Sequence, residues 1–186
     1  MITGCQGSTK APPPPPYSAW ALRDLLQDTV DELIKHPEQG AKILEKLIAT
    51  EDELKTLLHP DLLDPLSRHY TETLTPSFLR EAPQNITAVY TRGYTEIAVA
   101  RVGPNSGKHL SAGDLELLQK LPQRPALYVV RFRPPGAKIG LRMSGWTFIN
   151  QRWVTLLKLG ELLTPWRADE LKKLRLSALS QPPKSP

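Results

Sequence analysis

The stretch that decides the fold is residues 126–159, which read ALYVVRFRPPGAKIGLRMSGWTFINQRWVTLLKL. Its first part, residues 126–133, is rich in Val and aromatic side chains and is typical of a strand. The PPG that follows turns the chain into a second strand over residues 139–149, and an Asn-Gln pair separates that strand from a third over residues 152–159. Short connections between consecutive strands favour antiparallel pairing, so the stretch predicts a three-stranded meander.

The pair between the second and third strands, Asn150-Gln151, departs from the usual hairpin sequence. A two-residue type I′ turn needs positive φ at both central residues, which favours Asp-Gly or Asn-Gly. Gln151 is therefore expected to be strained or to belong to a longer loop.

Further strand structure is expected before the meander. Residues 86–101 (ITAVYTRGYTEIAVAR) are rich in Val, Ile, Thr and Tyr, with Gly93 as a bend or bulge. The GPNSG at 103–107 predicts a turn, and residues 111–120 predict a short helix.

The first third of the chain predicts amphipathic helices. The first lies between the N-cap Ser18 and Pro37, because apolar residues recur there at three and four positions. Its apolar stripe is Leu22, Leu25, Leu26, Val30, Leu33 and Ile34, and a second, shorter stripe is Ile43, Leu44, Leu47 and Ile48.

Two more helix starts follow. Thr50 and Glu53 form a capping-box pattern that opens a helix ending at Pro60, and Asp64-Pro65 is expected to be the N-cap and first-turn proline of another. With one apolar stripe each, these helices need a sheet to pack on. The sequence thus predicts an α+β fold, with three to four N-terminal helices packed on a curved antiparallel sheet of four to five strands.

The composition excludes several kinds of site. The chain has 186 residues, 40% of them hydrophobic and 23% charged, which is typical of a globular protein. Its single cysteine excludes an intramolecular disulfide and a cysteine-rich metal site, and its four histidines are scattered. Neither a metal nor a cofactor is predicted. No apolar run reaches the roughly 20 residues that would span a bilayer.

The start of the chain, Ile2-Thr3-Gly4-Cys5, resembles the lipobox of bacterial lipoproteins. The resemblance implies that Cys5 is acylated, that Met1 marks a truncated or mis-assigned start, and that Gln6 directs the protein to the outer membrane, facing the periplasm. Residues 6–16 contain five consecutive prolines, which favour an extended and semi-rigid spacer. The alternative is a free thiol in a cytoplasmic protein that begins at Met1. The predicted organisation is a lipidation site and tether (1–17), a domain (18–163) and a basic C-terminal tail (164–186).

Residues 141–163 (LRMSGWTFINQRWVTLLKLGELL) resemble the closing hairpin of nuclear-transport-factor-like domains, the ketosteroid-isomerase or cystatin-like cone. They are also similar to uncharacterised bacterial lipoproteins. The resemblance implies a cone whose helices cover the concave face of the sheet, a pocket between them, and frequent homodimers. Enzymes of this fold place a carboxylate base and a Tyr or His acid in that pocket.

No pair of residues in this sequence matches those enzymes, so no catalytic residue is predicted. The candidates for binding a ligand or a protein partner are Tyr90, Tyr94, Glu96, Tyr128, Trp146 and Trp153, and the ionisable pieces considered beside them are His69, His109 and Asp114. An enzymatic or small-molecule alternative requires a Tyr-lined cavity with a buried carboxylate such as Glu96, whose pKa burial would raise.

The two halves of the chain differ in charge. Residues 1–100 hold 9 basic and 14 acidic side chains, whereas residues 101–186 hold 15 basic and 5 acidic ones. A predicted arginine stripe on the sheet could contact anionic lipid or an acidic cell-wall polymer, or single-stranded nucleic acid if the protein is cytoplasmic. Its members are Arg131, Arg133, Arg142 and Arg152.

Taken together, these patterns predict a membrane-tethered periplasmic lipoprotein with a binding or scaffolding role and no catalysis. Two alternatives stay open: a binder or enzyme that uses the cone pocket, and a cytoplasmic nucleic-acid-binding module. For the basic segment 169–179 we expect docking on the acidic helical half.

Overall fold

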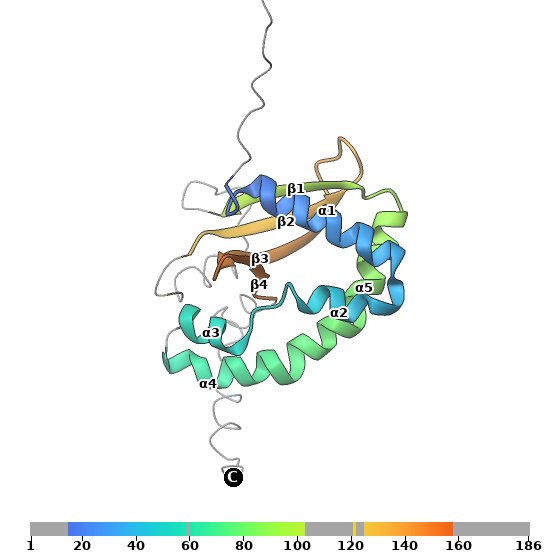
Figure 1. The fold of residues 1–186 in the computed structure, drawn as a ribbon. Coiled ribbons are helices and arrows are strands. Elements are labelled where there is room, and N and C mark those ends of the chain that lie inside the picture. The colour runs from blue at the N-terminus through green and yellow to red at the C-terminus, as the bar shows by residue number, and fades with distance from the viewer. Residues whose placement is uncertain (1–14, 59, 103–120, 122–124, 158–186) are drawn as a thin grey trace, which may run out of the picture.

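The computed structural model describes residues 15–58, 60–102, 121 and 125–157 (Figure 1). Its sheet has the strand order β1-β2-β3-β4, and each neighbouring pair is antiparallel. The strands are β1 (Glu96–Val102), β2 (Leu127–Arg133), β3 (Leu141–Ile149) and β4 (Arg152–Thr155). The predicted α+β class and the meander are confirmed. The predictions for residues 103–107, 111–120 and 169–179 lie outside the described residues.

Strand β4 is shorter than the sequence predicts, because it ends at Thr155 rather than at Leu159. Leu157 has a φ of 47°, a left-handed conformation that no strand continues through. The backbone N–H of Leu156 donates to the carbonyl of Gly145 over 2.8 Å and holds this end of the strand against β3.

The helices pack around this sheet. They are α1 (Ala19–Lys35), α2 (Gly40–Glu45) after a 3₁₀ turn (Pro37–Gln39), α3 (Glu51–Leu57), α4 (Pro60–His69) and α5 (Thr75–Thr91). A π-helical turn, Tyr70–Leu74, joins α4 to α5 without a break, so the two form one long arm (Figure 1). The expected helix start at Asp64-Pro65 is wrong. The helix α4 begins at Pro60, which occupies a first-turn position that suits a proline. Residue 64 therefore lies inside α4 and does not cap its start.

Two of the three predicted N-caps, Ser18 and Thr50, are confirmed. The N–H of Ala21 donates to Ser18 Oγ over 3.2 Å at the start of α1, which ends at Lys35. At α3 the capping box is complete: Glu53 N–H donates to Thr50 Oγ1 over 3.3 Å, and Thr50 N–H donates to Glu53 Oε2 over 2.8 Å.

The predicted strand over residues 86–101 is wrong in its first part, because residues 86–91 are the end of α5. Ala82 and Ile86 are buried at helical spacing, and this spacing prevails over the strand preference of the nearby Val, Thr and Tyr. Gly93 is not a strand bulge. It has a φ of 91° and ends α5 in a Schellman motif, with Gly93 N–H donating to Tyr90 O and Tyr94 N–H donating to Val89 O.

The Asn150-Gln151 turn joins β3 to β4 directly, since Ile149 pairs with Arg152. Asn150 and Gln151 have φ values of 48° and 61°, as a type I′ turn requires. The strained alternative is therefore correct, and Gln151 holds a conformation that costs a non-glycine residue about 1 kcal/mol.

Apolar side chains cover both faces of the sheet at one end. Along β2, Tyr128, Val130 and Phe132 belong to a core with α1, α2 and α5, whereas Leu127 and Val129 belong to a second core with α3 and α4. These two sets alternate along the strand and therefore point to opposite faces. The second face changes character at Arg131 and Arg133, which are half-buried. It is apolar near the start of β2 and basic near its end.

Candidate functional site

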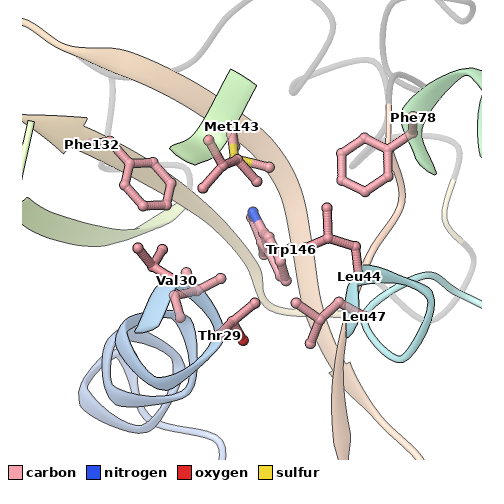
Figure 2. Close-up of a pocket in the computed structure, with 10 residues that line it drawn as sticks. Thr29, Val30, Leu44, Leu47, Phe78, Phe132, Met143 and Trp146 are labelled. Atoms are coloured by element: carbon pink, nitrogen blue, oxygen red, sulfur yellow. The ribbon is translucent and has the colours of Figure 1, made fainter. Parts of the chain in front are cut away.

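The space between the sheet and helices α1, α2 and α5 is filled with side chains (Figure 2). The cavity that remains there has a volume of about 10 Å³. That is about the room that one water molecule needs. The residues that line it are Leu26, Thr29, Val30, Leu44, Leu47, Phe78, Ile86, Phe132, Met143 and Trp146. All are apolar except Thr29, whose hydroxyl donates a hydrogen bond to the carbonyl of Leu25 over 2.7 Å. The cavity lining contains no Tyr and no carboxylate, so this cavity is not the one that the enzymatic alternative requires.

Trp146 lies in the wall of this cavity (Figure 2) and is 1% exposed. Its indole Nε1 is buried and has no hydrogen-bond partner among the described residues. The residue packs in the core and does not form a binding mouth at the surface.

Glu96 lies at the start of β1 and is half-exposed. It accepts a hydrogen bond from Arg133 Nε over 3.0 Å and one from the Gly136 N–H over 3.0 Å. These bonds lower the pKa of Glu96, and the bond from Arg133 contributes most. A base in a buried pocket would instead have a raised pKa, because burial disfavours the charged form. Glu96 is thus an ionised side chain that fixes the β2–β3 hairpin.

The two tyrosines near the end of α5 also lie away from the cavity lining. Tyr90 Oη accepts a hydrogen bond from Gln27 Nε2 over 3.0 Å, which ties α5 to α1. Tyr94 is half-buried against the core next to α1 and closes the Schellman motif. His69 ends α4 and is half-buried. His109 and Asp114 lie outside the described residues.

Tyr128 and Trp153 are brought together, and the group they bind is the end of the proline-rich segment. Trp153 Nε1 donates to the carbonyl of Pro16 over 2.9 Å, and Tyr128 Oη donates to the carbonyl of Tyr17 over 3.1 Å. Ser18 N–H donates to the carbonyl of Pro15 over 2.9 Å, so a tight turn leads the chain into α1. We call Pro15–Ser18, with Tyr128 and Trp153, the tether junction.

Aromatic contacts support the tether junction. The rings of Tyr128 and Trp153 meet edge to face with centroids 5.0 Å apart, and Phe148 meets Trp153 in the same way at 5.3 Å. Tyr17 lies against Phe148 at 6.4 Å. Such pairs restrain one another in orientation. The donors that hold Pro16 and Tyr17 are therefore preorganised on strands β2 and β4.

Three of the four arginines of the predicted stripe lie on one face of the sheet. Arg131 and Arg142 lie opposite each other in the β2–β3 register, and Arg133 is on the same face. Arg133 is paired with Glu96. We call Arg131, Arg133, Arg142 and Glu96 the charged face of the sheet.

Arg152 has a different role, because it is engaged inside the fold. Its Nε donates to Glu53 Oε1 over 2.8 Å, its Nη1 to the carbonyl of Lys46 over 2.6 Å, and its Nη2 to the carbonyl of Ile48 over 3.0 Å. The placement of Arg152 in an exposed stripe is therefore corrected. Its guanidinium fixes the segment before α3 to β4.

Glu53 and Tyr70 complete this buried network, and sequence reasoning missed the part they play in it. Glu53 is 3% exposed; burial acts to raise its pKa, but the hydrogen bonds from Arg152 and Thr50 prevail and lower it below 4.5. Tyr70 Oη donates to Thr155 O over 2.7 Å and accepts from Ala49 N–H over 3.2 Å, and burial raises its pKa. We call Glu53, Tyr70 and Arg152 the β4 clamp. Its role is structural.

Comparisons with protein-family models, with curated proteins and with solved structures return no match to this chain. Within the described ranges, no group of three or more His, Cys, Asp and Glu side chains could hold a metal ion. None of the helices in the described part of the chain is both long and apolar enough to cross a bilayer. The described features that bear on function are the tether junction and the charged face of the sheet.

Proposed function

We propose that this protein is a lipoprotein, held through acylated Cys5 at the outer membrane and facing the periplasm, whose domain binds or scaffolds other molecules and does not catalyse a reaction. The observation that carries the proposal is the tether junction. A spacer whose only role is to connect a domain to an anchor does not need to be bound by the domain. Here the end of the spacer is bound, because the carbonyls of Pro16 and Tyr17 accept hydrogen bonds from Trp153 and Tyr128.

The lipobox-like Ile2–Cys5 and the proline run supply the other half of the argument. A polyproline spacer is extended and stiff, so it keeps its two ends apart. Fixing its far end to a sheet fixes the direction in which the domain leaves the spacer. That combination suits a domain displayed at a set orientation from an anchor.

A non-catalytic role is supported by the described interior. The cavity beside Trp146 is the size of a single water and has an apolar lining. Glu96, the carboxylate that the enzymatic alternative would place in a cavity, instead pairs with Arg133 at the surface of the sheet.

The test is intact-mass and peptide mass spectrometry of the protein produced from its chromosomal gene and extracted from the membrane fraction. We expect an N-terminal peptide that starts at Cys5 and carries the mass of acyl chains. The matched control is Cys5→Ser, which should be depleted from the membrane fraction and carry no acyl mass. A wild-type chain with an unmodified Cys5 thiol would refute the anchor.

The charged face supports a second candidate function, contact with an anionic lipid or an acidic cell-wall polymer. Arg131 and Arg142 occupy directly opposite positions on neighbouring strands, so two basic side chains lie side by side on this face. Binding that falls steeply with added salt, and falls further in Arg142→Gln, would support it. The same assay with single-stranded nucleic acid tests the cytoplasmic alternative, since phosphate contacts give an equally steep salt dependence.

A further inference from the structure

Two large aromatic side chains at the start of α1 are not buried by the fold: Tyr17, just before the N-cap Ser18, and Trp20, in the first turn. Trp20 and Tyr17 are each 60% exposed, whereas the stripe that begins at Leu22 is buried along α1. Two helix positions differ by about 200°, so Trp20 points away from the core that Leu22 enters. The packing of the domain therefore gives no reason for an indole at position 20.

Both residues make contacts in these exposed positions. The carbonyl of Tyr17 accepts a hydrogen bond from Tyr128, and its ring rests against Phe148. The guanidinium of Arg23 lies 4.4 Å from the centre of the Trp20 ring. Arg23 also donates to Asp24 over 2.7 Å. Tyr17, within the tether junction, and Trp20, three residues later, thus both present exposed rings where the chain enters α1.

We infer that Tyr17 and Trp20 form a lipid-contact surface that inserts into the membrane interface next to the anchor and holds the domain against the leaflet. This inference rests on the proposed function. Trp and Tyr are the residues enriched where hydrocarbon meets water, because each has a large apolar ring and a polar N–H or O–H that stays hydrated. The occupant we assign is the lipid interface that the anchor itself enters.

The length of the tether supports this choice of occupant. Eleven residues, 6–16, separate Cys5 from Tyr17. As extended polyproline they reach about 34 Å. An anchored domain therefore samples the membrane at an effective concentration on the order of millimolar, at which a weak contact is enough to hold it.

Charge distinguishes this surface from the charged face. Asp24 is exposed one turn after Trp20 and pairs with Arg23, so the two charges beside the Trp20 ring offset each other. Arg133 lies five residues along β2 from Tyr128, about 17 Å away. Contact through Tyr17 and Trp20 should therefore depend on the aromatic rings and hardly on anionic lipid.

The experiment uses the full chain, with Cys5 coupled to a maleimide lipid in phosphatidylcholine vesicles whose acyl chains are brominated. Bromine quenches indole fluorescence only at short range, so we expect quenching in the wild-type chain. The chain has four tryptophans. The variant Trp20→Phe removes one reporter while keeping an aromatic ring, and it should lose that quenching. No quenching, or unchanged quenching in Trp20→Phe, would overturn the inference.

A matched pair of variants measures the contact itself, by vesicle co-sedimentation of the uncoupled chain. Ile34 lies on the same helix, is 45% exposed, and is about 21 Å from Trp20. We expect Trp20→Ser to weaken vesicle binding roughly tenfold or more and Ile34→Ser to leave it unchanged. Equal effects of the two changes, or binding that rises more than about tenfold when anionic phosphatidylglycerol is added, would contradict the inference.

These measurements separate the two proposals. The maleimide lipid supplies an anchor whether or not Cys5 is acylated in the cell, so a failed quenching experiment refutes the lipid-contact surface alone. An unmodified Cys5 in the native protein refutes the anchor alone.

Discussion

Removing Arg152 should destabilise the protein by about 3 kcal/mol at pH 7. The change Arg152→Met keeps much of the apolar stem but leaves the buried carboxylate of Glu53 without its partner. The carbonyls of Lys46 and Ile48 also lose the hydrogen bonds that Arg152 donates to them. Breaking a buried ion pair from one side typically costs about 3–5 kcal/mol. We take the lower end because the Arg152 side chain is still 34% exposed.

The cost of this change should shrink in acid. In the wild type the pKa of Glu53 lies below its ordinary value of 4.5, so the pair stabilises the fold above about pH 4.5, and this contribution is lost as the pH falls through the folded pKa. In the variant only burial and the bonds from Thr50 remain. Burial then raises the pKa, and protonation relieves the unpaired charge. The difference in free energy of unfolding between the two proteins should therefore be smaller at pH 4 than at pH 7.

The assay is urea unfolding followed by far-ultraviolet circular dichroism at both pH values, with free energies from linear extrapolation. The matched control is Arg80→Met, since Arg80 pairs with Glu81 at the surface and its loss should change stability by less than about 0.5 kcal/mol. The double variant Glu53→Met/Arg152→Met should recover a large part of the loss. A cost below about 1 kcal/mol at pH 7, or a cost that grows toward pH 4, would refute the described burial of this pair.

Three further changes test other parts of the fold. Gln151→Gly should stabilise the protein by about 0.5–1 kcal/mol, because it relieves a positive φ of 61° in the β3–β4 turn; a lower urea midpoint would contradict this. Gly40→Ala should cost about 1–3 kcal/mol, since the new Cβ would lie 2.6 Å from Pro83 Cβ, and an unchanged thermal midpoint would show that α2 and α5 are not so close. Trp153→Phe should lose about 1 kcal/mol with the bond to Pro16, and limited proteolysis should then cut near the tether junction sooner than in the wild type; identical digestion would argue against that bond.

Local signals in the sequence were enough for the N-caps of α1 and α3 and for the meander. Ser18 and Thr50 bind backbone amides three residues away, and Asn150-Gln151 joins adjacent strands, so each depends on a few neighbouring residues. The strand prediction for residues 86–91 was wrong because it followed their composition. The burial of Ala82 and Ile86 at helical spacing makes this segment part of α5 instead. Tertiary contacts override propensity in such cases.

The candidate site was harder to predict, because its contacts span the chain. Tyr128 and Trp153 could be selected as aromatic residues of the sheet, but the carbonyls they bind lie 111 and 137 residues away. The partner of Arg152 is 99 residues distant, and nothing in the capping box of Glu53 indicates that its carboxylate also receives an arginine. No periodicity or short motif encodes pairings of that range.

The tether junction has a mechanical consequence. A force that pulls on the chain before Pro15 acts on Pro16 and Tyr17 before it acts on α1. The carbonyls of these two residues accept hydrogen bonds from side chains on β4 and β2. Strands β2 and β4 each pair with β3, so the load enters the sheet on both sides of that strand. Pulling on the segment before Pro15 would therefore strain the centre of the sheet, instead of peeling the first helix away from the domain.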